Sequence, residues 1–273
     1  MMKRLVGSRL LGARALSSTP SKSIFHGVFP IMATPFNPDE SLDLDGFRRS
    51  IAFMQEAGAD GATIVGVLGE SNRMTDKERE ALIRAAIETA ADGGRPFPIC
   101  VGTSHAGTAA TVALSQMAMD LGAAAVMVTP SKEAVPPSDD AFVALYSRVA
   151  EGCPGLAIVL QDHPASTQVS MTPRLVARIA AEVPAVACIK LESLPTPGRI
   201  ATLRQLWRGL ASPSTDACFQ PAALHGPLPL ASVICVPLLP GQPNSPRAET
   251  APSSRASVLC TAGSIWSRAP RAS

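Results

Sequence analysis

The sequence lacks the features that mark a membrane-spanning or nucleic-acid-binding protein. No apolar run reaches the roughly 18 residues that a membrane-spanning helix needs. The 24 Lys and Arg residues nearly balance the 22 Asp and Glu residues, which gives a formal net charge of +2. These basic residues are scattered and form no stripe with aromatic residues between them. We therefore expect neither a membrane nor a nucleic acid as a partner.

Closely paired cysteines are also missing. The six cysteines are widely spaced, with no C-x-x-C pair and no histidine at metal-ligand spacing. They are Cys100, Cys153, Cys188, Cys218, Cys235 and Cys260. This pattern is typical of reduced thiols in an intracellular protein, and it predicts no metal site.

The two ends of the chain differ in composition from its middle. Residues 1–23 contain five basic residues, five serines and no acid, which is the composition of a transit peptide or of a disordered leader. A transit peptide would direct the protein to mitochondria or another organelle matrix, and otherwise we expect a cytoplasmic protein. Residues 208–273 are rich in Pro and Ser and show no helical periodicity, so we expect a largely irregular tail.

One segment of this tail is an exception. Residues 228–239, LPLASVICVPLL, are apolar enough to pair with an open sheet edge or to aggregate. Pro229 and Pro237 argue against a strand in the middle of a sheet, because proline has no N–H to donate.

Residues 24–207 alternate short apolar runs with amphipathic helical patterns. Thr75 and Glu78 have the spacing of a capping box, and Thr172 precedes Pro173 at a predicted first helical position. The apolar runs predict strands at 28–34, 62–67, 97–103, 124–130, 156–161 and 185–191.

About six units of one strand and one helix indicate a parallel α/β domain. The first strand-to-helix turn lacks the glycine fingerprint of a doubly wound sheet. We therefore predict an incomplete TIM (β/α)8-type barrel.

Lys190 lies within the apolar stretch AVACIKLES, residues 185–193. Burial of an ammonium group is costly unless the group is paired or deprotonated. The side chain could lie along apolar surface with its amine in water, or the amine could be kept partly neutral for attack on a carbonyl. The surrounding residues leave both interpretations open.

Polar groups follow two other predicted strands at their carboxyl ends, where barrel enzymes place their reactive groups. GVLGES, residues 66–71, has glycines that permit a tight turn and N–H groups that could bind a carboxylate. LQDHP, residues 160–164, places Gln161 and Asp162 at the same mouth. His163 and His105 also lie near strand ends, and we interpret both as packing or loop residues.

Four motifs together resemble the dihydrodipicolinate synthase and N-acetylneuraminate lyase family of class I aldolases. They are FPIMATPF, GVLGES followed by Glu78, LQDHPAST and CIKLES. The resemblance covers residues 24–207 and implies that Lys190 forms a Schiff base with pyruvate or another 2-oxo acid. It also implies that no metal or organic cofactor is needed and that the protein forms a homo-oligomer. The residues assigned by it are Lys190 and Gln161 for catalysis, and Thr34, Val67, Leu68, Gly69, Glu70, Ser71 and Asp162 for substrate binding.

Several positions depart from the family pattern. Val67 and Leu68 stand where dihydrodipicolinate synthases carry two threonines, and Gln161 stands at the position of the proton-shuttle tyrosine. Ser131 or Lys132 stands at the second tyrosine, and the substrate-clamping arginine falls near Ser166. A glutamine cannot act as an acid or base near neutral pH, so we do not expect dihydrodipicolinate synthesis itself.

The motifs are closer to the branch of the family that acts on 2-keto-3-deoxy sugar acids, as 2-keto-3-deoxyarabonate dehydratase does. Asp162 and Glu192 are candidates to move the proton there, and a structural role is the alternative for each. The resemblance ends before the seventh and eighth strands. Two hypotheses follow, namely a Schiff-base lyase and an inactive truncated member that at most binds 2-oxo acids or intact subunits.

Overall fold

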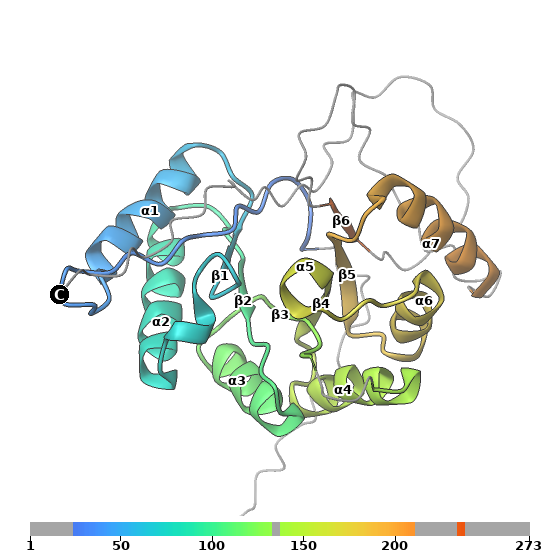
Figure 1. Cartoon of the computed structure of the whole chain (residues 1–273). Helices are drawn as coiled ribbons and strands as arrows, with labels where there is room; N and C mark the ends of the chain where they lie inside the picture. Colours follow the sequence, from blue (N-terminus) through green and yellow to red (C-terminus); the bar gives the residue numbers. More distant parts are fainter. Residues whose placement is uncertain (1–23, 133–136, 211–233, 238–273) are drawn as a thin grey trace, which may run out of the picture.

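Strands and helices alternate along the described part of the chain, which comprises residues 24–132, 137–210 and 234–237 of a computed structural model. The strands lie in the centre and the helices form an arc around them (Figure 1). Within these ranges, no helix has both the length and the apolar character needed to cross a membrane. The expected leader, residues 1–23, lies outside the described residues.

The strands form one six-stranded sheet in chain order. Each of β1 to β5 pairs in parallel with the next, whereas β6 pairs antiparallel with β5. The bounds are β1 (Ala62–Ile64), β2 (Ile99–Gly102), β3 (Ala125–Val128), β4 (Ala157–Asp162), β5 (Val186–Leu191) and β6 (Ile234–Pro237). Five of the six strands predicted in 24–207 are confirmed by β1 to β5.

The helices begin at the positions that the sequence predicted. Thr75 and Glu78 form a complete capping box at α2, and the Thr172 side chain caps α6 with Pro173 at its start. The helices are α1 (Leu44–Glu56), η1 (Ser71–Arg73), α2 (Asp76–Asp92), α3 (Thr108–Asp120), α4 (Asp139–Gly152), α5 (Pro164–Thr167), α6 (Pro173–Glu182) and α7 (Thr196–Leu210).

The strand predicted at 28–34 is wrong as a continuous strand. A single parallel bridge joins Ile31 to Thr63, with Met32 N–H donating to Thr63 O at 2.8 Å and Thr63 N–H donating to Pro30 O at 2.9 Å. Pro30 has no N–H to donate to the partner strand, so the ladder does not extend toward residue 28. The segment still lies beside β1, where the first strand of a barrel belongs.

The tail contributes one strand to the sheet. β6 pairs with β5 over Cys188 to Leu191, which confirms that part of 228–239 can pair with an open sheet edge. It runs antiparallel, so it does not continue the parallel strand–helix repeat of β1 to β5. The rest of the tail predicted to be irregular lies outside the described residues.

The two faces of the sheet bury different residues, because successive side chains of a strand point to opposite faces. The larger cluster joins the outer face to the helices and includes Ile158, Leu160, Ile189 and Leu191. The smaller cluster contains strand and N-terminal residues only, and its buried members are Phe25, Phe29, Ile31, Cys100, Ala125, Met127, Val159 and Cys188. We call the face of this second cluster the inner face.

Candidate active site

Lys190 lies on the inner face near the carboxyl end of β5. Cys188, two residues earlier, belongs to the inner cluster, and Lys190 follows it on the same face. Its register partner on β4 is Gln161, which follows inner-cluster Val159 in the same way. Lys190 is only 2% exposed. Its amine therefore does not extend into bulk water, which excludes the solvent-facing interpretation.

Glu192 is the carboxylate beside this lysine. Its Oε2 atom lies 3.4 Å from Lys190 Nζ and accepts a hydrogen bond from Gln161 Nε2 at 2.7 Å. The Glu192 backbone N–H donates to Asp162 O at 2.9 Å, which fixes the chain just beyond β5. A lysine, a carboxylate and an amide thus meet at the inner mouth of β4 and β5.

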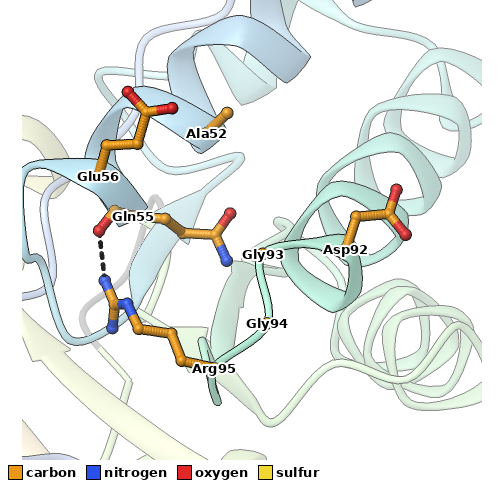
Figure 2. A pocket seen from close by; sticks show the side chains of 7 residues that line it. All are labelled: Ala52, Gln55, Glu56, Asp92, Gly93, Gly94 and Arg95. Atoms are coloured by element: carbon orange, nitrogen blue, oxygen red, sulfur yellow. Dashed lines mark hydrogen bonds between the residues drawn. The ribbon is translucent and has the colours of Figure 1, made fainter.

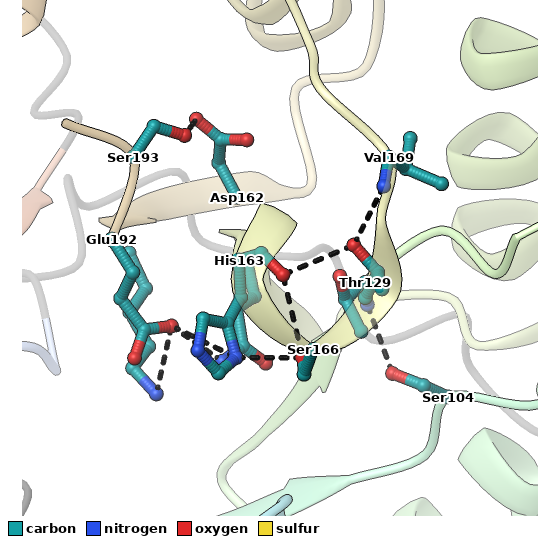
Figure 3. A network of polar contacts seen from close by, with 11 residues as sticks. Ser104, Thr129, Asp162, His163, Ser166, Val169, Glu192 and Ser193 are labelled. Carbon is teal, nitrogen blue, oxygen red and sulfur yellow. Dashed lines mark hydrogen bonds and ion pairs between the residues drawn. The ribbon is translucent and has the colours of Figure 1, made fainter.

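His163 and Ser166 extend this cluster outward, as Figure 3 shows. His163 Nδ1 lies 3.8 Å from Glu192 Oε2 and 2.8 Å from Ser166 Oγ. Sequence reasoning gave His163 no role in the site. The available signal was its position directly after a buried strand that ends in Gln161 and Asp162.

Asp162 differs from its expected place in the substrate pocket. It alternates with Gln161 on β4, so its side chain points to the outer face, where it is fully buried. Arg199 Nη2 from α7 lies 2.9 Å from its Oδ2, and Ser193 Oγ donates to the same oxygen. This geometry gives Asp162 a structural role and corrects the expectation that it contacts substrate.

The turn 66–71 follows β1. Thr34 Oγ1 donates to Gly69 O at 2.7 Å and ties the turn to the N-terminal segment. The N–H groups of Glu70 and Ser71 donate to Val67 O at 3.1 Å and Gly66 O at 3.3 Å, so the turn itself uses them. The Leu68 side chain packs against the inner cluster. A carboxylate cradle made by Glu70 and Ser71 N–H groups, as expected, would have to break these bonds.

The backbone is strained at the residue that precedes this turn. Val65 has φ = 55°, a left-handed conformation that β-branched residues rarely adopt. Gly102 of β2 lies against it, and a Cβ atom there would come within 2.3 Å of Val65 O. Glu70, with φ = 53°, directs its carboxylate to Arg73, whose Nε lies 3.3 Å away. The N–H groups of Leu68 and Gly69 donate no hydrogen bond to other described residues.

The sole tyrosine of the chain cannot replace the family's shuttle tyrosine. Tyr146 is fully buried on α4 and donates its hydroxyl to Val128 O at 3.0 Å. Burial, reinforced by the charge of Asp162, raises the pKa of Tyr146. At the positions expected for the second tyrosine, Ser131 Oγ donates to Ala106 O at 3.3 Å and Lys132 Nζ donates to Gln168 Oε1.

No group of three His, Cys, Asp or Glu residues that could hold a metal occurs within the described ranges. Cys100, Cys153 and Cys188 are buried. Burial and the nearby charge of Asp120 raise the pKa of the Cys153 thiol.

A separate hollow opens at the amino end of β2, between α1 and the turn after α2 (Figure 2). Arg95 in this hollow donates to Gln55 O at 2.7 Å and lies 5.3 Å from the centre of the Phe97 ring. Arg95 thereby satisfies a carbonyl at the end of α1. Lys190 lies near the opposite, carboxyl ends of the strands, so the hollow is not part of the candidate site.

Comparison with protein families identifies the family to which this fold belongs. Residues 24–213 match the model of the dihydrodipicolinate synthetase family. The chain belongs to this family. The match agrees with the resemblance carried by the four sequence motifs and with the barrel-like arrangement of β1 to β5.

Curated relatives of the family carry two different names. The chain is 38% identical over 195 residues to L-2-keto-3-deoxyarabonate dehydratase of Azospirillum brasilense, covering 70% of this chain and 59% of the relative. It is 36% identical over 181 residues to 4-hydroxy-tetrahydrodipicolinate synthase of Stenotrophomonas maltophilia strain K279a, covering 66% of this chain and 58% of the relative. The chain thus spans less than two thirds of the length of these relatives.

Solved structures of the family share the fold. Dihydrodipicolinate synthase from Thermotoga maritima superposes with a TM-score of 0.62 at 30% identity, covering 68% of this chain and 61% of that one. A prophage family member from E. coli K12, determined in complex with pyruvate, superposes with a TM-score of 0.62 at 28% identity over 68% of this chain and 60% of that one. The predicted α/β barrel architecture is confirmed, in the incomplete form that the described strands have.

Proposed function

We propose that this dihydrodipicolinate synthetase family member is a Schiff-base lyase in which Lys190 condenses with the keto group of a 2-oxo acid. The observation that carries the proposal is the burial of Lys190 on the inner face, with its Nζ atom 3.4 Å from Glu192 Oε2. A buried amine at the carboxyl end of a barrel strand is placed to attack a carbonyl in the pocket.

The reaction begins when a neutral Lys190 amine attacks the keto carbon. The hydroxyl group of the resulting carbinolamine takes up a proton from solvent and leaves as water, which gives a protonated imine whose positive charge lies near the Glu192 carboxylate. The imine withdraws electrons from the adjacent carbon, which loses a proton to a base and becomes an enamine carbon. Glu192 is the base in this scheme, because the neighbouring Gln161 is an amide that cannot take up a proton.

Three reactions can involve this enamine. It can add an aldehyde, or it can expel a β-hydroxyl group as water. In the reverse of the addition, cleavage of a larger 2-oxo acid releases an aldehyde and forms the enamine. We favour dehydration of a 2-keto-3-deoxy sugar acid for two reasons. Gln161 stands at the position of the shuttle tyrosine. In addition, one relative that is 38% identical to this chain is named as such a dehydratase. The lysine itself supplies the electron-withdrawing imine, so these steps use no metal or organic cofactor.

The substrate carboxylate is expected at the turn 66–71. Val67 and Leu68 have no side-chain hydroxyls, so backbone groups must supply the hydrogen bonds. The N–H groups of Leu68 and Gly69 are the proposed donors, with Thr34 holding the turn through Gly69 O. Glu70 and Ser71 then shape this turn, and their own N–H groups do not contact the substrate.

An inactive family member is the alternative, and one observation favours it. β6 occupies the free edge of β5 in antiparallel orientation, where a parallel strand–helix unit would otherwise extend the barrel. A pocket that lacks one wall could position its substrate poorly, and a displacement of about 1 Å can cost about 100-fold in rate. Such a chain would at most bind 2-oxo acids or intact subunits.

Borohydride trapping separates these two functions. The protein is incubated with pyruvate or a 2-keto-3-deoxy sugar acid and then reduced, which converts any imine into a stable secondary amine that intact-mass measurement detects. We expect an adduct in the unsubstituted protein and in the Lys77→Arg variant, whose altered lysine is exposed on α2. We expect none in Lys190→Arg. Folded, soluble protein that gives no adduct with either compound would support the inactive alternative.

A further inference from the structure

We propose that His163 and Ser166 form the route by which protons pass between Glu192 and solvent. This inference rests on the proposed Schiff base at Lys190 and adds to it the path of the proton. It assigns a role to the two side chains of the cluster that the scheme above does not use. Both lie in the network of Figure 3, at the end of β4 and the start of α5.

Glu192 needs such a route because it is enclosed. Its side chain is 10% exposed, and its Oε2 atom already faces Lys190 Nζ and Gln161 Nε2. Neither of these neighbours can accept a proton from it, since one becomes the imine nitrogen and the other is an amide. A proton taken from the substrate would therefore return to the carbon it left, unless a third group removes it.

His163 is the third group at the same oxygen. Its Nδ1 atom lies 3.8 Å from Glu192 Oε2, a separation that one modest side-chain movement or one water molecule closes. Exposure of the side chain rises from 3% at Lys190 through 10% at Glu192 to 21% at His163, and Ser166 is exposed. The cluster thus runs continuously from the buried amine to the surface.

Ser166 has two acceptors within reach, which allows it to switch. Its Oγ atom lies 2.8 Å from His163 Nδ1 and 3.3 Å from His163 O. When the hydroxyl donates to Nδ1, the neutral ring carries its proton on Nε2. When the hydroxyl turns to the backbone carbonyl, the Nδ1 lone pair is free to accept a proton from Glu192.

The transfer balances without any further reactant. The Nδ1 lone pair forms the new N–H bond, and the electrons of the broken O–H bond remain on Glu192 as carboxylate. The Nδ1 proton then passes to Ser166 Oγ, which releases its own proton to water, so the ring returns to the neutral form with its proton on Nε2. Because the histidine itself is neutral before and after, the cycle can repeat at each turnover.

The imidazole has no competing task in the capping of α5. At the start of α5, the His163 backbone carbonyl accepts hydrogen bonds from Ser166 N–H at 3.2 Å and Thr167 N–H at 3.1 Å. The His163 side chain makes no capping hydrogen bond. A change of the ring therefore leaves these backbone interactions in place.

Exchange of the pyruvate methyl protons with D2O, followed by proton NMR, tests the route in the full chain. In His163→Asn, an amide replaces the ring near Nδ1 but cannot carry a proton. We expect a full borohydride adduct with an exchange rate at least about tenfold lower, because the abstracted proton returns to its carbon. Added imidazole should restore the rate, which it would not do if His163 were merely structural. His105→Asn, which alters a histidine outside the cluster, should exchange at the unsubstituted rate.

The outcomes distinguish this inference from the proposed function. A full adduct with an unchanged exchange rate in His163→Asn, or a slow rate that imidazole does not restore, would overturn the route and leave the Schiff base standing. Absence of any adduct in the unsubstituted protein would overturn both. Should His163→Asn fail to fold, Ser166→Ala decides, because it keeps the ring. We then expect a full adduct and an exchange rate about three- to tenfold lower, and an unchanged rate would overturn the route.

Discussion

The inner and outer faces of β4 and β5 carry opposite chemistry within two neighbouring residues. On the inner face, Gln161 and Lys190 meet Glu192 in a cluster that reaches solvent through His163. On the outer face, Asp162 is buried against Arg199. The alternation of side chains along a strand therefore decides which carboxylate is available for a reaction, more than distance along the sequence does.

The two carboxylates also differ in how their charge is compensated. Asp162 receives a charged hydrogen bond from Arg199 and a neutral one from Ser193, both at Oδ2, so its negative charge has a cationic partner within the protein. Glu192 faces an amine that must become an imine in the proposed reaction, so its compensation changes during turnover. The outer carboxylate is suited to holding α7 against the sheet, and the inner one is suited to moving a proton.

The largest expected effect comes from breaking the outer pair. Arg199→Met leaves Asp162 buried without its cation, which should lower the free energy of unfolding by about 3 kcal/mol. Urea unfolding measures this loss. The matched change Arg204→Met on the same helix should cost less than about 0.5 kcal/mol, as a substitution away from such a pair does. Equal losses in the two variants would show that the outer pair does not anchor α7.

Glu192→Gln tests the inner face and should spare stability. The amide keeps the hydrogen-bonding shape but cannot take up a proton, so exchange of the pyruvate methyl protons should fall about 100-fold. Borohydride should still trap an adduct at Lys190. Glu182→Gln, which alters an exposed glutamate paired with Arg178 on α6, serves as the control and should exchange at the unsubstituted rate. An unchanged rate in Glu192→Gln would remove Glu192 from the proposed reaction.

Tyr146→Phe tests the hydrogen bond between α4 and the end of β3, on the outer face of the sheet. Loss of the hydrogen bond to Val128 O should cost about 1 kcal/mol of unfolding free energy at pH 7. The pKa of Tyr146 is raised above its ordinary value of 10.0 in the folded protein. The unfolded chain therefore loses this proton first, and stability present below pH 10 declines as the pH rises further.

The Tyr146→Phe variant has no phenol to ionise, so it does not show this loss of stability above pH 10. The stability difference between the two proteins should therefore shrink above pH 10, which urea unfolding at pH 7 and at higher pH measures. A constant difference across this range would contradict the assignment of the alkaline loss to Tyr146.

Thr34→Val should have the smallest effect on stability. It removes the hydroxyl that donates to Gly69 O, at a cost of about 0.5 kcal/mol. If the turn 66–71 holds the substrate carboxylate, the pyruvate concentration needed for half-maximal trapping should also rise. Thr34→Ser keeps the hydroxyl and should trap like the unsubstituted protein. Identical trapping curves for Thr34→Val and Thr34→Ser would separate this turn from substrate binding.

Much of the fold could be predicted because apolar runs and helix caps are local signals. Five buried strands and the caps at Thr75 and Thr172 appear where their own residues place them. The first strand was overestimated, because its apolar residues hide the loss of the N–H group at Pro30. The antiparallel direction of β6 depends on which sheet edge is free, which no local pattern encodes.

The candidate site was predicted in part for a related reason. Lys190 could be placed because it ends an apolar strand and lies in a distinctive motif. Asp162 was misplaced, because its face depends on the register of β4 with β5. Glu192 was a candidate by its position and His163 was given no role, because the two side chains meet only when the chain segments after two different strands converge.

Peptide mapping after pyruvate trapping tests most directly whether the buried inner-face lysine is the nucleophile. The protein is reduced with borohydride in the presence of pyruvate and digested, and the modified lysine is located by mass spectrometry. We predict modification at Lys190 and none at the more accessible Lys77 and Lys132. Modification of either of those residues with Lys190 unmodified would contradict the assignment of Lys190 as the Schiff-base residue.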